Sequence, residues 1–208
     1  MTGTRGRLVA LEGIDGCGKS TQALILAARL DAVSTFEPGA TPLGAALRHL
    51  LLGSDGAPVA VRAEALMMAA DRAQHVADVI APALDAGRWV VTDRYSASTL
   101  AYQGFGRGLD QGELEAMVGW ATGGLRPDLT VLFDLPVSVA AARRSGAGDD
   151  RMEAEGLAFQ QRVADGYLAL AAEGRDAWLV VDASEPVESV AAAVWDAVEV
   201  VAGPGGIR

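Results

Sequence analysis

The residues best suited to chemistry form one glycine-rich stretch, which reads Gly13-Ile14-Asp15-Gly16-Cys17-Gly18-Lys19-Ser20 and is followed by Thr21. The stretch matches the phosphate-binding pattern G-x-x-x-x-G-K-[ST] in full. Glycines allow backbone N–H groups to turn towards a polyphosphate, and the N-terminus of a following helix adds the positive end of its dipole. The pattern therefore predicts nucleotide binding by residues 13–21, with Lys19 on the β- and γ-phosphates and the Ser20 hydroxyl on Mg²⁺.

Lys19 and Cys17 are each the only residue of their type in the chain. The other 16 residues counted as Lys or Arg are all arginines. Arginine has a broad planar fork, which does not replace the compact charge of lysine in a tight phosphate-binding loop. A single cysteine cannot form an internal disulfide, which fits a reducing cytosol. We interpret Cys17 as a small residue that fills the loop, with a reactive thiol as the alternative.

This stretch needs a strand before it and a helix after it, and the sequence offers both. Residues 8–11 form a short apolar stretch that fits a buried strand. Residues 19–30 contain neither glycine nor proline and fit a helix. Further apolar strands alternate with helical stretches, which predicts a three-layer α/β/α fold with a five-stranded parallel sheet. The expected strands are 8–11, 33–36, 89–92, 129–133 and 178–181. The expected helices are 19–30, 42–52, 62–86, 111–122, 137–144, 152–173 and 187–201. Thr41 is expected to cap the second helix and Pro82 to kink the third.

In a sheet of this kind, ligands gather beyond the carboxyl ends of the strands. Glu37-Pro38-Gly39 follows the second strand, Asp93-Arg94-Tyr95 follows the third, and Asp134 ends the fourth. An acid at the end of a neighbouring strand is the usual second magnesium ligand beside a phosphate-binding loop. Both Asp93 and Asp134 qualify by position, and Asp93 is favoured because Arg94 beside it could hold a second phosphate. The alternative for either aspartate is an ordinary strand-end cap.

Three arginines flank a glycine-containing loop at residues 145–150, and they are Arg143, Arg144 and Arg151. This pattern predicts a mobile lid over about residues 143–153, whose arginines would neutralise charge on a transferring phosphoryl group. A solvated helix end is the alternative. The tail at residues 203–208 is expected to be disordered.

Length and composition limit the class of protein. With 208 residues, half of them apolar, the chain is expected to form one domain with a substantial core. A net charge of −10 argues against nucleic-acid binding as the main function of this protein. No apolar run reaches membrane-spanning length and no signal peptide is visible, so we expect a soluble, cytoplasmic protein with no membrane partner.

Taken together, these motifs resemble the bacterial thymidylate kinases, which belong to the nucleoside monophosphate kinases with a phosphate-binding loop. The resemblance runs in order over almost the whole chain. It rests on residues 13–21, the Glu37-Pro38-Gly39 turn, the run from Asp93-Arg94-Tyr95 to Gly104, Pro127-Asp128-Leu129 and Asp150-Arg151-Met152-Glu153. The run from 93 to 104 is far more specific than the phosphate-binding loop. The resemblance implies ATP- and Mg²⁺-dependent phosphorylation of dTMP to dTDP by a homodimer.

The resemblance also implies roles for individual residues. Lys19 and the loop would hold ATP, Ser20 and Asp93 would serve the metal, and the catalytic arginine would come from Arg143, Arg144 and Arg151 because the loop interior has no basic residue. The dTMP site would consist of Asp15, Glu37, Met68, Arg72, Arg94, Ser98, Thr99, Tyr102 and Gln103. Arg94 would hold the dTMP phosphate, Tyr102 would crowd the sugar C2′, Asp15 would lie near the 3′ hydroxyl, and Arg72 would hydrogen-bond the thymine.

Two positions depart from the family pattern. Phe36 stands where the family commonly has an arginine that assists in holding the acceptor phosphate. Binding of that phosphate would therefore depend more on Arg94. Met68 stands where a phenylalanine commonly stacks on thymine, and a thioether still packs against a flat ring. Met68 could equally be core filler.

Two other functions fit the phosphate-binding loop alone. One is a small kinase with a different monophosphate or a small alcohol as acceptor, which the run from 93 to 104 disfavours. The other is a nucleotide switch that acts through partner binding. A GTPase needs an Asn-Lys-x-Asp motif, which a chain with Lys19 as its only lysine lacks, and the transporter signature Leu-Ser-Gly-Gly-Gln is absent too.

Overall fold

The computed structural model describes residues 5–53, 58–144, 152, 155–174 and 176–203. It contains a five-stranded parallel sheet in the order β2-β3-β1-β4-β5. The strands are β1 Leu8–Glu12, β2 Val33–Phe36, β3 Val90–Asp93, β4 Leu129–Asp134 and β5 Trp178–Asp182. The predicted parallel sheet is therefore confirmed, with strand ends that differ from the predicted ones by at most one residue.

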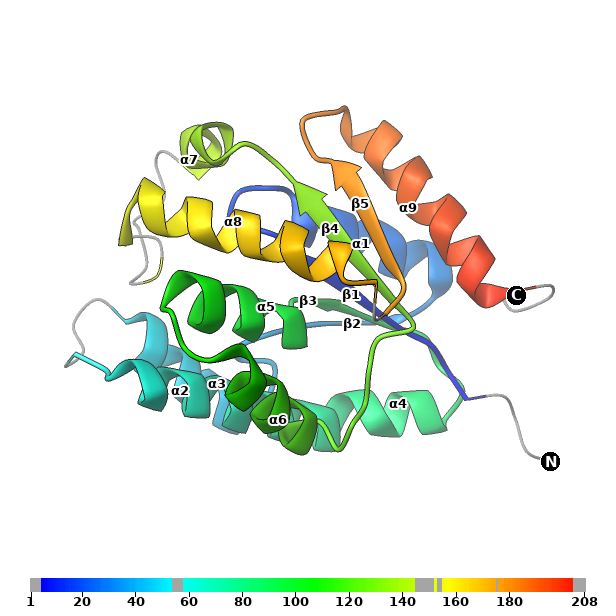
Figure 1. The fold of residues 1–208 in the computed structure, drawn as a ribbon. Coiled ribbons are helices and arrows are strands. Elements are labelled where there is room, and N and C mark those ends of the chain that lie inside the picture. The colour runs from blue at the N-terminus through cyan, green and yellow to red at the C-terminus, as the bar shows by residue number, and fades with distance from the viewer. Residues whose placement is uncertain (1–4, 54–57, 145–151, 153–154, 175, 204–208) are drawn as a thin grey trace.

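Helices cover both faces of the sheet (Figure 1). One face carries α1 and α9, which pack against each other, and the other carries α8 together with the segments between β2 and β4. The helical segments are α1 Lys19–Leu30, α2 Pro42–Leu52, α3 Val61–His75, η1 Val76–Ile80, α4 Ala81–Asp85, α5 Ser96–Thr99, η2 Leu100–Gly106, α6 Gln111–Ala121, α7 Val137–Arg144, α8 Leu157–Ala172 and α9 Val187–Ala202.

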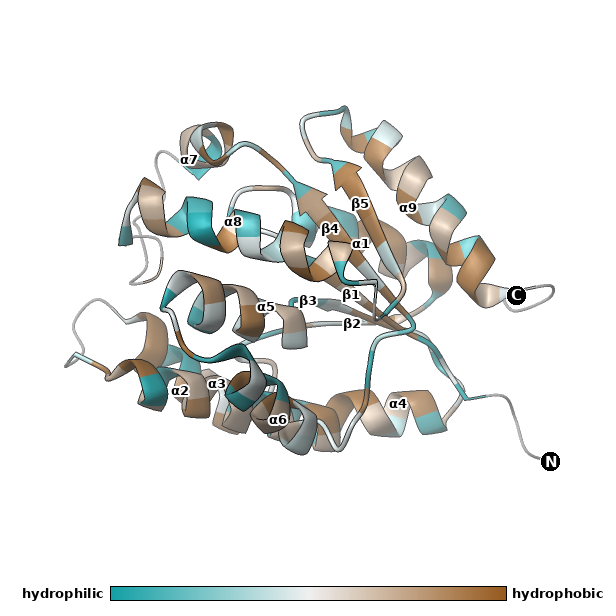
Figure 2. Ribbon diagram, viewed as in Figure 1, coloured by the Kyte–Doolittle hydropathy of each residue, from teal (hydrophilic) through white to brown (hydrophobic). Residues whose placement is uncertain are grey.

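The central strand β1 is buried along its whole length. Val9 and Leu11 belong to the larger hydrophobic cluster, while Leu8 and Ala10 pack in a second cluster with Ile80 on the opposite face. Strands covered on both faces are mostly apolar along their length, as Figure 2 shows for β4. The strands β3 and β2 lie on one side of β1, and β4 and β5 lie on the other. Ligands are expected in the crevice at the carboxyl end of β1, where the strand order changes direction.

Two helices differ clearly from the predicted ones, each for a local reason, and one further helical segment was not predicted. The helix predicted over 62–86 contains the π-helical turn η1 just before Pro82, because proline has no N–H to donate and its ring clashes with the preceding turn. The helix predicted from Met152 begins at Leu157, since Gly156 has a φ of 85° and a helix cannot continue through it. Residues 96–106, for which the sequence predicts neither a helix nor a strand, form α5 and η2.

The remaining local predictions can be compared directly. Thr41 is the N-cap of α2, where its hydroxyl accepts a hydrogen bond from Gly44 N–H at 3.0 Å. Arg151, most of the predicted lid and residues 204–208 of the predicted disordered tail lie outside the described residues. Within the described part of the chain, no helix is both long enough and apolar enough to cross a membrane.

Candidate active site

The glycine-rich loop joins β1 to α1 and depends on glycine at two close approaches. Gly13 has a φ of 141°, and a Cβ added there would lie 2.8 Å from the carbonyl oxygen of Phe133. Gly16 has a φ of 87°, and its Cβ would lie 2.7 Å from the carbonyl oxygen of Ala140. Any other residue would push the loop off β4 and α7, so the chain needs glycine at both positions to hold this loop conformation.

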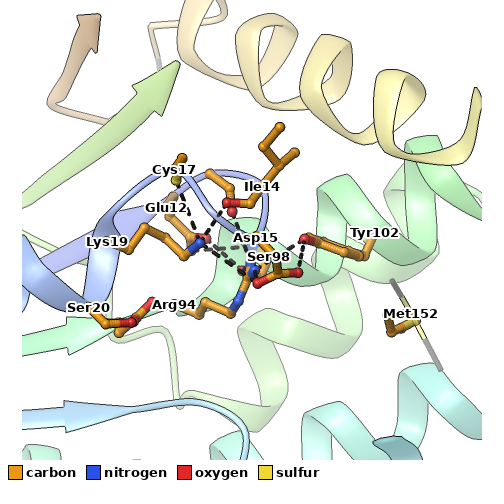
Figure 3. Close-up of polar contacts among 12 residues, drawn as sticks. Glu12, Ile14, Asp15, Cys17, Lys19, Ser20, Arg94, Ser98, Tyr102 and Met152 are labelled. Carbon is orange, nitrogen blue, oxygen red and sulfur yellow. Dashed lines mark hydrogen bonds and ion pairs between the residues drawn. The ribbon is translucent and has the colours of Figure 1, made fainter. Parts of the chain in front are cut away.

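Lys19 lies in the first turn of α1 and folds back over the loop (Figure 3). Its ammonium group donates a hydrogen bond to the carbonyl oxygen of Ile14 at 2.9 Å and lies 4.0 Å from a carboxylate oxygen of Asp15. The side chain is 5% exposed. A positive charge is thus fixed inside the loop, where the sequence predicts the nucleotide phosphates.

Ser20 and Asp93, the two residues predicted to serve the metal, are neighbours. The Ser20 hydroxyl donates a hydrogen bond to the Asp93 carboxylate at 2.6 Å, because the pairing of Leu11 with Asp93 places the ends of β1 and β3 side by side. Asp134 instead lines a separate cavity next to α7 and α8.

A hydroxyl and a carboxylate oxygen suit Mg²⁺, which usually takes one or two protein ligands and completes its octahedron with water and substrate phosphates. Among the described residues, no group of three or more His, Cys, Asp or Glu side chains could form a complete protein cage for a metal. The donor set at Ser20 and Asp93 therefore fits an ion that is shared with a nucleotide.

Arg94 forms a network of hydrogen bonds at the carboxyl end of the sheet. Its backbone has a positive φ of 75°, which is uncommon for a residue other than glycine. The guanidinium donates to the carboxylate of Asp15 at 2.5 Å and to the Tyr102 hydroxyl at 3.1 Å. It also donates to the carbonyl oxygen of Gly13, the Ser98 hydroxyl and the Tyr167 hydroxyl. These contacts fix the direction of the guanidinium next to the phosphate-binding loop.

Asp15 faces Arg94 from the loop. Burial acts to raise the pKa of this carboxyl group, but the charges of Arg94 and then Lys19 outweigh burial and hold the pKa well below its usual range. The Tyr102 hydroxyl donates to the second carboxylate oxygen at 3.0 Å. Asp15 is therefore an anion in the neutral pH range and lies between the two cations.

Two adjoining cavities open at this end of the sheet. The first is lined by all nine residues predicted to bind dTMP, together with Pro38, Arg48, Leu52 and Met152, which sequence reasoning missed. The second is lined by the phosphate-binding loop, including Lys19 and Ser20, and by Asp93 and Arg143. Asp15, Glu37, Arg48 and Arg94 line both cavities. The fold thus places the predicted nucleotide site directly beside the predicted acceptor site.

Arg72 and Glu37 form a buried ion pair under the first cavity. Arg72 Nε donates to Glu37 at 2.8 Å, and its two Nη atoms donate to the Thr99 hydroxyl and the Tyr95 carbonyl oxygen. Burial acts to lower the pKa of Arg72, but the charge of Glu37 outweighs it and raises the pKa. The other oxygen of Glu37 contacts His75 at 2.9 Å. Arg72 is therefore a fixed cation at the wall of the cavity.

The predicted lid arginines divide between different partners. Arg144 donates to the backbone carbonyl of Asp15 at 2.9 Å, so it contacts the phosphate-binding loop directly. Arg143 donates to the carbonyl oxygen of Ala183 at 3.1 Å and lines the second cavity. Arg151 lies outside the described residues.

Sequence reasoning missed Glu12, Arg107 and Tyr167. Glu12 ends β1 and is completely buried, and a carboxylate directly after four apolar residues was a signal that could have found it. Arg107 follows η2 and hydrogen-bonds Glu64, Glu155 and the sulfur of Met152, a residue at the wall of the first cavity. Tyr167 is one tyrosine within α8, and no local pattern there indicates a site.

Comparison with known proteins identifies the family. The thymidylate kinase family model matches residues 11–194. A thymidylate kinase of Synechococcus sp. (strain RCC307) is 52% identical over 198 residues, which cover 89% of this chain and 92% of that protein. A thymidylate kinase of Leifsonia xyli subsp. xyli (strain CTCB07) is 51% identical over 200 residues, which cover 93% of this chain and 94% of that protein. The chain belongs to the thymidylate kinase family.

Proposed function

We propose that this protein transfers the γ-phosphoryl group of ATP to dTMP, with Mg²⁺, and forms ADP and dTDP. The observation that carries the proposal is the pair of adjoining cavities that share Asp15 and Arg94. One contains a phosphate-binding loop, and the other contains the nine residues predicted for dTMP. Family membership supplies the identity of the acceptor.

The donor side of the reaction rests on Lys19 and the loop. The backbone of residues 13–21 and the Lys19 ammonium would hold the ATP phosphates. Ser20 and Asp93 would hold Mg²⁺, which supplies positive charge that offsets the charge of the phosphoryl oxygens. Arg144 already contacts the loop at the Asp15 carbonyl, and Arg143 lines the donor cavity, so these two arginines are the best placed to act on the transferring group.

The acceptor side rests on Arg94. Its guanidinium would bind the dTMP phosphate at the border of the two cavities, where a phosphate oxygen faces the γ-phosphoryl group. The phosphate of dTMP is already an anion, so the transfer requires no strong general base. The protein contributes by positioning two polyanions and by offsetting their repulsion with fixed cations.

The base of dTMP would lie in the inner part of the first cavity, between Met68 and Met152, with Arg72 and Gln103 as polar groups. Tyr102 would exclude a 2′ hydroxyl, and its own hydroxyl is held by Asp15. Ser98 and Thr99 bind Arg94 and Arg72 and so support both ends of this site.

We further propose a cytoplasmic homodimer, as the family resemblance implies. Large apolar side chains are exposed on three adjacent helices, with Leu50 on α2, Leu66 on α3 and Trp120 on α6 exposed by 56%, 61% and 86%. Exposed apolar groups of this size on neighbouring elements are typical of protein interfaces. The molar mass in solution, measured by light scattering, tests the proposal, and a monomer at all concentrations would contradict it.

A coupled assay of ADP release tests the function. The purified protein with ATP and Mg²⁺ is offered dTMP, dUMP, dCMP, AMP or GMP, and we expect turnover with dTMP to exceed turnover with each of the others. The variant Lys19→Ala serves as the control for contaminating kinases and should lose activity by roughly a thousandfold or more while its thermal unfolding stays close to wild type. Faster turnover with another acceptor would overturn dTMP as the substrate.

A further inference from the structure

Glu12 is a completely buried carboxylate at the end of β1, one residue before the phosphate-binding loop (Figure 3). We propose that Glu12 is a positioning residue for the acceptor site, an inference that rests on the proposed function. Glu12 fixes the direction of Arg94 and the location of the helical segment that carries Ser98, Tyr102 and Gln103.

One carboxylate oxygen of Glu12 caps that helical segment. Oε1 accepts hydrogen bonds from the backbone N–H groups of Tyr95 at 2.9 Å and Ser98 at 3.2 Å, at the N-terminus of α5. The N-cap residue of α5 is Tyr95, whose side chain makes no capping hydrogen bond. Glu12 therefore supplies from β1 the hydrogen-bond acceptor that the N-terminus of α5 needs.

The other oxygen controls two hydroxyl groups. Oε2 accepts hydrogen bonds from the Ser98 hydroxyl at 2.6 Å and the Tyr167 hydroxyl at 3.0 Å. Burial raises the pKa of Tyr167, so its hydroxyl keeps the proton that it donates. Four donors aimed at one side chain match the acceptor capacity of a carboxylate.

The direction of these hydrogen bonds determines which atoms of Ser98 and Tyr167 face Arg94. Each hydroxyl group has a single proton. Ser98 gives its proton to Glu12, and Tyr167, whose oxygen lies 2.9 Å from that of Ser98, gives its proton to Glu12 or to Ser98, so both oxygens present only lone pairs to Arg94. Arg94 Nη1 donates to them at 3.1 Å and 3.2 Å. Glu12 thus holds Arg94 through two intermediaries without touching it, while Asp15 holds the other Nη atom from the loop.

The substitution Glu12→Gln separates the two effects of the carboxylate. The amide oxygen must take the place of Oε1, where two backbone N–H groups need an acceptor, so the amide NH₂ faces Ser98 and Tyr167. These hydroxyls then lose their acceptor, and at least one turns its proton towards Arg94, which is itself a donor. The cap of α5 is kept, and the orientation of Arg94 is lost.

Steady-state kinetics of this variant test the proposal. We expect Glu12→Gln to raise KM for dTMP about tenfold, the size of one lost charge-assisted hydrogen bond, and to leave KM for ATP within about twofold. Glu12→Asp keeps the charge but is too short to reach α5, so it should raise KM for dTMP and also increase hydrogen exchange of the Tyr95 and Ser98 amides, measured by NMR. Equal effects of Glu12→Gln on both KM values, or wild-type kinetics of both variants, would overturn the proposal.

A double-substitution cycle separates positioning from a general loss of stability. Tyr167→Phe removes one of the two hydroxyl intermediaries, so the effect of Glu12→Gln on KM for dTMP should be smaller in that background than in the wild type. Fully additive effects would contradict a shared path to Arg94. Absence of wild-type turnover with dTMP would reject the proposed function instead, and amide exchange at Tyr95 and Ser98 would still test Glu12.

Discussion

At the scale of single residues, the site depends on the contact between Arg94 and Asp15. Both Nη atoms of the guanidinium have acceptors in the protein, including a carboxylate oxygen at 2.5 Å from one and a backbone carbonyl oxygen at 3.2 Å from the other. Arg94 is thus oriented towards both cavities by the protein itself. A lysine in its place would keep the charge but not the planar fork of donors.

This difference gives a prediction for Arg94→Lys. We expect KM for dTMP to rise by about tenfold to a hundredfold while KM for ATP changes little, because several directed hydrogen bonds to the acceptor side are lost. Steady-state kinetics with each substrate varied measure the effect. The matched control is Arg126→Lys, at the exposed ion pair with Asp176, which should leave both values unchanged. An equal rise of both KM values in Arg94→Lys would contradict the assignment of Arg94 to the acceptor.

Asp15 gives a pH-dependent prediction. Its pKa in the folded protein lies below the ordinary value of 3.8, so folding favours the ionised form. Its contribution to the free energy of unfolding is therefore fully present above that ordinary value and is lost as the pH falls towards the folded pKa. Urea unfolding should show a larger loss of stability for Asp15→Asn at about pH 6 than at about pH 3. A difference that does not change with pH would contradict the ion pair with Arg94.

The sequence was informative where a residue type and its position agreed. Asp93 and Arg94 could be predicted because they end an apolar strand, and family resemblance extended the prediction to Gln103. Tyr167 could not be identified as a site residue, because its importance depends on the packing of α8 against Glu12 at the end of β1. That packing brings together residues that are 155 positions apart.

At the scale of elements, the acceptor site depends on the close packing of η2 against α8. A Cβ added at Gly166 in α8 would lie 2.6 Å from Cγ of Phe105, and one added at Gly106 would lie 2.7 Å from the ring of Phe159. Arg162 donates two hydrogen bonds to the carbonyl oxygen of Gly106, at the end of η2. The glycines allow the two segments to approach each other, and this approach places Tyr167 next to Ser98 at 2.9 Å.

We therefore expect Gly166→Ala to lower the free energy of unfolding by about 1–3 kcal/mol, because the added methyl group overlaps an aromatic ring in a packed interface. The control is Gly119→Ala in α6, where an added Cβ has no heavy atom within 4 Å. Alanine is the better helix former, so this variant should gain about 0.5–1 kcal/mol. Urea unfolding measures both, and a stabilised Gly166→Ala would contradict the close packing.

Element boundaries show why part of the fold escaped prediction. The inner strands β1, β3 and β4 could be predicted from apolar composition, since burial on both faces leaves few alternatives. The helical turns at 96–106 could not, because glycines at 104 and 106 disfavour a helix there. That segment is helical because Glu12 caps its start and α8 packs against its side.

At the scale of the whole molecule, strand order explains how the fold brings the two predicted anion-binding sites together. The central position of β1, with β3 on one side and β4 on the other, places the loop after β1 next to the residues after β3. In a chain of net charge −10, the cations Lys19, Arg72, Arg94, Arg143 and Arg144 are concentrated at the carboxyl end of the sheet. This concentration offsets the repulsion between two polyanions.

The proposed function requires direct transfer of a phosphoryl group between the two cavities. The most direct test is a single-turnover reaction of excess protein with Mg²⁺, dTMP and ATP labelled at the γ-phosphorus, followed by separation of the nucleotides. We expect the label to move to dTDP, and we expect Lys19→Ala to transfer it far more slowly. Release of the label as inorganic phosphate, with no labelled dTDP, would rule out direct transfer from ATP to dTMP.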